Sequence, residues 1–124
     1  MNGDLLAKGS KDPKRGHLRK ADEISSVFDF KCRVSSEHLV ALGKPNYLEF
    51  PRLAIMVAKK TNRLAARRNY MKRVIREGYR QNSTNLVSLD IVLRVTKSFE
   101  KTDFVVINQE INQIFKKLLK CRAS

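Results

Sequence analysis

Residues 53–80 read LAIMVAKKTNRLAARRNYMKRVIREGYR, and within them a strand pattern gives way to a helix pattern. Large apolar side chains occupy every second position over 53–57, which is the period of a strand with one buried face. Over 64–81 the apolar side chains recur at helical spacing instead. A second alternating run, LDIVLRV, follows at 89–95. Strand, helix and strand in this order predict helices packed on a small sheet.

The flanking segments extend this order in both directions. Residues 21–28 carry apolar side chains at helical spacing, and residues 31–42 have the short apolar patches of extended chain. Gly-Lys-Pro-Asn at 43–46 is a turn signal. Residues 111–119 show the clearest helical pattern of the chain. The predicted fold class is α+β, an α/β sandwich with about four strands in the order α-β-β-β-α-β-α.

Length and charge limit the kind of partner. The 124 residues fit one domain, and 42% hydrophobic residues suffice for a core. Against 12 Asp and Glu stand 26 Lys and Arg, a net charge of +14 that a polyanion such as nucleic acid would neutralise. We predict a flexible basic arm over residues 1–17 and one RNA-binding domain over residues 18–124.

Two classes of protein are disfavoured. The longest apolar run, at 53–58, is six residues, whereas a membrane span needs roughly 20. The first residues also lack the apolar core of a secretory signal. Cys32 and Cys121 lie far apart, without a C-x-x-C pair or a nearby histidine at zinc-ligand spacing. We therefore predict two free thiols in a reducing compartment, a cytoplasmic location and no membrane contact.

The helix over 64–81 is expected to have one apolar arc and one basic face. The arc contains Leu64, Met71, Val74, Ile75, Gly78 and Tyr79. Seven basic residues lie between residues 63 and 80, with Glu77 as the one acid. Like charges one turn apart repel by a few tenths of a kcal/mol per pair, so the helix has to be stabilised by packing of its apolar arc. We expect its charged face to bind phosphate groups.

Arginine predominates on this face, and guanidinium groups grip phosphate oxygens and stack on unpaired bases. The loop before the helix extends the basic surface towards the sheet edge. The predicted RNA contacts are Lys59, Lys60, Arg63, Arg67, Arg68, Asn69, Tyr70, Lys72, Arg73, Arg76 and Arg80.

Groups able to catalyse hydrolysis are scarce. His17 and His38 are 21 residues apart, and most acids occur singly. No D-x-D, H-x-H or G-x-x-x-x-G-K motif is present. A protein nuclease needs a general base, a carboxylate cage for a metal or a histidine pair. We therefore predict no catalytic residue and no metal site in the protein itself.

Other classes of binding protein are open at this point. A ribosomal or other structured-RNA-binding protein would have the same composition. A DNA-binding transcription factor could use residues 64–81 as a recognition helix, although cations with a single Asn are typical of phosphate contacts rather than of base readout. A membrane-surface helix is disfavoured because its apolar arc is needed to cover the sheet.

Four short motifs decide between these alternatives. In chain order they are Ala58-Lys59-Lys60, Arg68-Asn69, Lys72-Arg73 and Arg76-Glu77-x-Tyr79-Arg80. They resemble the signature of the bacterial ribonuclease P protein subunit, and the resemblance extends loosely over residues 18–120. One departure is Tyr70, which stands where the family usually has the second Arg of Arg-Asn-Arg.

The resemblance implies a left-handed β-α-β crossover and assembly with a large catalytic RNA. That holoenzyme is an endoribonuclease which removes the 5′ leader of precursor tRNA. Catalysis would belong to the RNA subunit, with Mg²⁺ bound mainly by that RNA. The implied partners are the catalytic RNA and precursor tRNA, with one monomeric protein per RNA.

The resemblance also implies roles for individual residues. The contacts to catalytic RNA that it carries over are Lys59, Lys60, Arg68, Asn69, Lys72, Arg73 and Arg76. A cleft between the sheet and the first helix would hold the single-stranded leader. The candidates for this cleft are Phe28, Ile24, Leu42 and Arg52.

Overall fold

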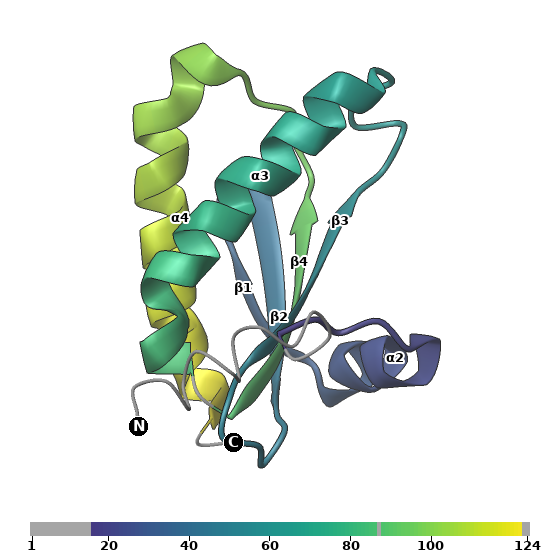
Figure 1. Ribbon diagram of the computed structural model, residues 1–124, viewed down its shortest axis with the longest axis vertical. Coiled ribbons are helices and arrows are strands. Elements are labelled where there is room, and N and C mark those ends of the chain that lie inside the picture. The colour runs from purple at the N-terminus through teal and green to yellow at the C-terminus, as the bar shows by residue number, and fades with distance from the viewer. Residues whose placement is uncertain (1–15, 87, 123–124) are drawn as a thin grey trace, which may run out of the picture.

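The computed structural model describes residues 16–86 and 88–122, and over them helices and strands follow the predicted order (Figure 1). The main elements are α2 (Ala21–Phe30), β1 (Cys32–Ser35), β2 (Leu39–Pro45), β3 (Arg52–Val57), α3 (Ala65–Asn82), β4 (Leu89–Val95) and α4 (Phe104–Leu118). Three short 3-10 turns accompany them, η1 (Ser83–Leu86), η2 (Lys101–Asp103) and η3 (Leu119–Arg122). None of these described helices is long and apolar enough to cross a bilayer.

The sheet is mixed and has four strands in the order β1-β2-β4-β3. β2 pairs antiparallel with both β1 and β4, whereas β3 pairs parallel with β4. A parallel pair needs a crossover connection, and α3 provides it. Six of the seven residues of β4 are buried, as expected for a strand covered on both faces. The α+β class and the predicted order of elements are confirmed.

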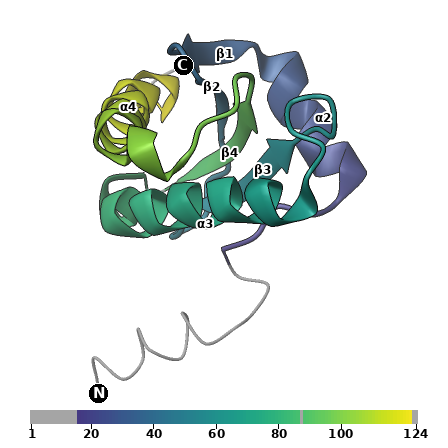
Figure 2. The same cartoon turned by 90° about the horizontal axis from the view of Figure 1, so that it is seen from above.

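Helices cover both faces of the sheet unequally (Figure 2). α3 and α4 lie together on one face, and α2 lies on the other. The larger core cluster joins α3 and α4 to the sheet through Met71, Ile75, Ile111 and Phe115. A smaller cluster beneath α2 contains Val27. The face of α3 away from α4 and the sheet is therefore left to solvent.

The chain joins the fold before the first helix. The Leu18 amide donates to the Leu53 carbonyl (3.0 Å), and the Leu53 amide donates to the Gly16 carbonyl (2.9 Å). Residues 16–18 thus run parallel to β3 along its outer edge. Of the arm predicted for residues 1–17, the first fifteen lie outside the described residues, while Gly16 and His17 belong to the folded unit.

The turn predicted at residues 43–46 is wrong in its position. β2 continues through Gly43 to Pro45, and the chain turns after Asn46 instead. The Asn46 side chain accepts a hydrogen bond from the Leu48 amide (2.8 Å) and so closes that turn. Gly43 serves close packing, since a Cβ there would lie 3.2 Å from the Cβ of Cys121.

The prediction of two free thiols is also wrong. Cys32 and Cys121 form a disulfide with their Cα atoms 5.8 Å apart. Although 89 residues separate them in sequence, β1 begins beside η3 in space. Sequence spacing alone gives no sign of this contact, because it is made by the packing of the C-terminal turn against the sheet.

Candidate nucleic-acid interface

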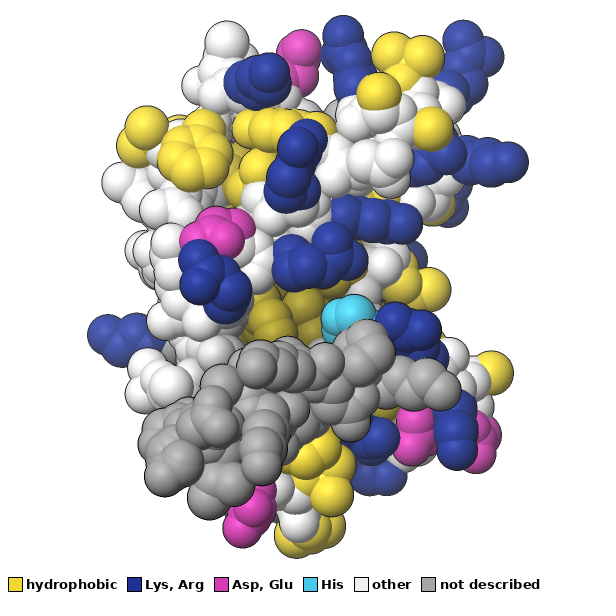
Figure 3. Space-filling model, viewed as in Figure 1, with side chains coloured by type: hydrophobic (Ala, Val, Ile, Leu, Met, Phe, Trp, Pro, Cys, Tyr) yellow, Lys and Arg dark blue, Asp and Glu magenta, His cyan; other side chains and the backbone are white. Residues whose placement is uncertain are grey.

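α3 is held by its apolar side, as predicted. Met71, Val74, Ile75 and Gly78 are buried. The approach to α4 is close at Gly78, where an added Cβ would lie 2.5 Å from Cγ2 of Ile111. This packing stabilises a helix whose like charges would otherwise oppose its formation. In Figure 3, Lys and Arg side chains gather over α3 on the face of the molecule shown.

The loop before α3 is ordered by hydrogen bonds. Oδ1 of Asn62 accepts from the Leu64 amide (3.0 Å), which prepares the start of the helix. The Arg68 guanidinium donates to the carbonyls of Asn62 (2.9 Å) and Arg63 (3.0 Å). Arg68, predicted as an RNA contact, thus also holds the basic loop in shape. Leu64 is 57% exposed and lies outside the apolar arc in which the sequence placed it.

Seven cations of the predicted RNA-binding set form no ion pair with a carboxylate within residues 16–86 and 88–122. They are Lys59, Lys60, Arg63, Arg68, Lys72, Arg73 and Arg76. Two further members do have acidic partners. Arg67 lies 3.4 Å from Glu100, and Arg80 lies 2.6 Å from Glu77. Exposed pairs of this kind contribute only about 0–1 kcal/mol, so a phosphate can replace either carboxylate.

The remaining members of the set are neutral. Asn69 is exposed beside the cations, whereas Tyr70 is half-buried. The Tyr70 ring meets Phe99 edge-on with the two ring centroids 6.3 Å apart. Tyr70 therefore contributes to the core edge, and only part of its ring is available to an RNA base.

The candidates for the leader cleft lie on the opposite face of the sheet, beneath α2. Leu42 is only 7% exposed and packs in the smaller core cluster with Val27 and Val92. Ile24 and Phe28 pack against this cluster but remain partly exposed. Of these apolar candidates, Ile24 and Phe28 have surface to offer a ligand, and Leu42 chiefly supports them.

Arg52 is held by ion pairs that could not be predicted from its neighbours in the sequence. Its guanidinium donates to both carboxylate oxygens of Asp90 (2.8 and 2.7 Å) and to Glu23 (3.0 Å). Hydrogen bonding to Asp90 raises the pKa of Arg52 further above its ordinary value. Arg52 thereby ties α2 to the sheet, and its charge is already balanced by the chain's own carboxylates.

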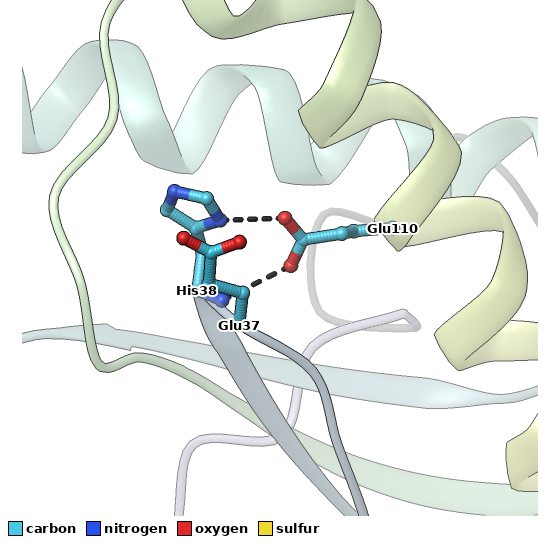
Figure 4. A group of neighbouring side chains, drawn as sticks. All are labelled: Glu37, His38 and Glu110. Carbon is cyan, nitrogen blue, oxygen red and sulfur yellow. Dashed lines mark hydrogen bonds and ion pairs between the residues drawn. The ribbon is translucent and has the colours of Figure 1, made fainter.

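One cluster outside the basic face was assigned no role from the sequence. His38 and Glu110 meet with Nδ1 and Oε2 2.5 Å apart, and Glu37 lies beside them (Figure 4). Oε1 of Glu110 accepts from the Ser36 hydroxyl (2.6 Å) and from the His38 amide (3.0 Å). Burial alone would raise the pKa of the Glu110 carboxyl, but these hydrogen bonds outweigh burial and lower it.

This cluster links α4 to the turn between β1 and β2. Lys97 already pairs with Glu37 (2.8 Å), and both oxygens of Glu110 have partners. Mg²⁺ prefers oxygen ligands in octahedral geometry with several waters retained, which a histidine and occupied carboxylates do not offer. The donor set does not fit Mg²⁺, and its observed contacts make it a structural tie.

Comparisons with known proteins agree with the motifs on α3. The family model for ribonuclease P matches residues 13–119. The ribonuclease P protein component of Chromobacterium violaceum is 37% identical over 112 residues, which cover 90% of this chain and 93% of that protein. The corresponding Pseudomonas aeruginosa protein is 35% identical over 106 residues, or 85% of this chain and 78% of that one.

Solved structures show the same fold. The ribonuclease P protein of Thermotoga maritima superposes with a TM-score of 0.63 at 27% identity, covering 84% of this chain and 94% of that one. The Staphylococcus aureus protein gives a TM-score of 0.65 at 22% identity, with coverages of 86% and 94%. The chain therefore belongs to the ribonuclease P protein component family and is a protein subunit of the ribonuclease P holoenzyme.

Proposed function

We propose that α3 and the loop before it bind the catalytic RNA of ribonuclease P, and that the complex removes the 5′ leader of precursor tRNA. This proposal is supported by the row of cations that have no acidic partner in the described part of the chain and that lie on and before a helix fixed by packing. A rigid helix presents its charges in one geometry, so little conformational entropy is lost when phosphates bind.

The protein's part is binding rather than bond breaking. Among the described residues, the one group of three or more His, Cys and acidic side chains close enough to hold a metal ion is Glu37, His38 and Glu110, whose contacts are structural. We propose that the RNA subunit holds the Mg²⁺ required for hydrolysis and performs the reaction. One protein monomer per RNA would lower the repulsion between catalytic RNA and precursor tRNA, both of which are polyanions.

The leader of precursor tRNA is assigned to the α2 side of the sheet. The partly exposed Phe28 and Ile24 are apolar surfaces on which single-stranded bases can pack. Arg52 supports this side by fixing α2 to the sheet through Glu23 and Asp90. Its place in the leader site is therefore that of a positioning residue.

Cleavage kinetics at low Mg²⁺ test the proposal. Purified protein is mixed with catalytic RNA and precursor tRNA, and leader release is compared with that by RNA alone. The protein should accelerate cleavage, and Lys72→Ala with Arg73→Ala should lose most of the acceleration. Lys117→Ala, which removes an exposed charge from α4, serves as the matched control. No acceleration by the wild-type protein would overturn the proposal.

A further inference from the structure

Three side chains able to ligate a metal ion meet where the turn between β1 and β2 contacts α4. They are Glu37 and His38 of the turn and Glu110 of α4. Each offers one ligand atom, and these three atoms lie within 4.8 Å of one another. Figure 4 shows both carboxylates beside the imidazole. A tetrahedral Zn²⁺ ion holds its ligand atoms roughly 3.3–3.6 Å apart, so small side-chain movements would bring the three donors to one ion.

The Glu110 carboxylate is oriented with one oxygen towards the imidazole. Its Oε1 accepts hydrogen bonds from the Ser36 hydroxyl (2.6 Å) and the His38 amide (3.0 Å). Its Oε2 lies 2.5 Å from Nδ1 of His38. Hydrogen bonds that orient a carboxylate in this way are typical of the surroundings of protein metal sites. A bound ion would replace the proton between Nδ1 and Oε2, and this proton would pass to solvent.

The imidazole of His38 is held in place from several sides. The side chain is only 9% exposed, and its ring meets Phe99 edge-on with the two ring centroids 6.3 Å apart. The His38 carbonyl accepts hydrogen bonds from the amides of Thr96 (2.9 Å) and Lys97 (3.3 Å). Because these contacts already fix the position of Nδ1, little conformational entropy would be lost when an ion binds.

The charge at this cluster differs from that of the chain as a whole, which is +14. Two carboxylates, those of Glu37 and Glu110, face the ammonium group of Lys97, which lies 2.8 Å from Glu37. The hydrogen bond from Lys97 lowers the pKa of Glu37, and the charge of Asp103 opposes this effect. Asp103 therefore adds a further negative charge nearby, and the cluster favours cations locally.

The donors suit a transition metal, although they do not suit Mg²⁺. Imidazole nitrogen is a good ligand for Zn²⁺, Ni²⁺ and Cu²⁺, whereas Mg²⁺ prefers oxygen ligands alone. Zn²⁺ also accepts carboxylate oxygens, and three protein ligands leave its fourth position to water. The exposed pair between Lys97 and Glu37 contributes little to stability, so an ion can displace Lys97 from this carboxylate.

We propose that this cluster binds one divalent transition-metal ion, with Zn²⁺ as the probe, through a carboxylate oxygen of Glu37, Nδ1 of His38 and Oε2 of Glu110. The ion would strengthen the tie between α4 and the turn that joins β1 to β2. The inference does not depend on the function proposed for α3. It departs from the expectation, based on the sequence, that the protein itself has no metal site.

Isothermal titration calorimetry of the full chain without RNA measures affinity and stoichiometry. ZnCl₂ and MgCl₂ are titrated separately, without reductant, so that Cys32 and Cys121 stay paired and provide no thiolate ligand. One Zn²⁺ per chain should bind, at least about tenfold more tightly than Mg²⁺, as expected for a site with an imidazole ligand. The absence of saturable Zn²⁺ binding, or equal affinity for the two ions, would overturn the proposal.

Two exposed residues locate the site without disturbing the core. Glu37→Gln should weaken Zn²⁺ binding by about tenfold or more, because it removes a ligand. Lys97→Ala should tighten Zn²⁺ binding, because Lys97 competes with the ion for Glu37. His17→Gln, which removes the other histidine of the chain, is the matched control and should leave the affinity unchanged. Zn²⁺ affinities that stay at the wild-type value in both Glu37→Gln and Lys97→Ala would overturn the proposal.

NMR and thermal unfolding test the role of His38. Zn²⁺ should shift the ring signals of His38 and leave those of His17 unchanged. Zn²⁺ should also raise the Tm of the wild type, because the site exists only in the folded chain. His38→Gln loses its pair with Glu110 and should unfold at a lower temperature, so the quantity compared is the rise in Tm caused by Zn²⁺, which should disappear. Shifts confined to His17, or an equal rise in Tm for His38→Gln, would overturn the proposal.

Discussion

Gly78→Ala probes the contact that holds the RNA-binding helix in place. The new Cβ would lie 2.5 Å from Cγ2 of Ile111, closer than real carbon contacts, so one of the two helices must shift. Ile111 offers little relief. It is fully buried, and a β-branched side chain in a helix has essentially one χ1 rotamer.

Two opposing effects determine how much Gly78→Ala changes the free energy of unfolding. Alanine is a better helix former than glycine by about 0.5–1 kcal/mol, which favours the variant. Overpacking a well-filled core costs about 1–3 kcal/mol, which opposes it. The clash is with a methyl next to the helix backbone and not with a flexible chain end, so the cost should win. We expect a net loss of about 0.5–2 kcal/mol in the free energy of unfolding.

Urea denaturation followed by circular dichroism measures this loss, with Gln113→Ala on the exposed side of α4 as control. Pairing Gly78→Ala with Ile111→Ala sharpens the test. Removing the methyl groups of Ile111 alone should cost about 2–5 kcal/mol, and less when the alanine introduced at position 78 fills part of the cavity. A Gly78→Ala protein as stable as the wild type, or more stable, would refute the close helix contact.

Three further perturbations test other ties in the fold. Reducing the Cys32–Cys121 bond, or Cys32→Ala, should cost up to about 4.6 kcal/mol in the chain-entropy treatment of an 89-residue loop, and reductant should have no further effect on the variant. Arg52→Ala should cost about 3 kcal/mol because it leaves the buried carboxylate of Asp90 without its ion-pair partner; an unchanged urea midpoint would contradict that role. Since the pKa of Glu110 is lowered in the folded state, its contribution is present above the ordinary value of 4.5 and is lost as the pH falls through the folded pKa. Glu110→Gln should therefore flatten the acid side of the stability profile measured by thermal unfolding.

The order of elements could be predicted because each has a strong local pattern. β3 alternates large apolar residues with smaller or flexible ones, and β4 has apolar residues at every second position. α3 and α4 have apolar faces at helical spacing. The local sequence pattern gave a wrong prediction where the conformation of a residue depends on contacts with residues distant in sequence. Gly43 and Pro45 have the composition of a turn, yet they continue a strand that is paired on both sides.

The charge of the candidate RNA-binding site could be predicted from the sequence, but the ion-pair partners of its individual residues could not. The sequence shows which side of α3 is basic, and the structure has that side exposed. It does not show that Arg52 meets Asp90, since 38 residues separate them and their meeting depends on the register of β3 with β4.

The salt dependence of binding to catalytic RNA tests the central role of α3 most directly. Binding constants are measured over a series of salt concentrations for wild type, Lys72→Ala, Arg73→Ala, Arg76→Ala and the control Lys117→Ala. Each α3 variant should reduce the slope of log K against log salt by about 0.7–0.9 for every phosphate that it no longer neutralises, while the control keeps the wild-type slope. Slopes that remain at the wild-type value in all three α3 variants would contradict the assignment of this face to RNA.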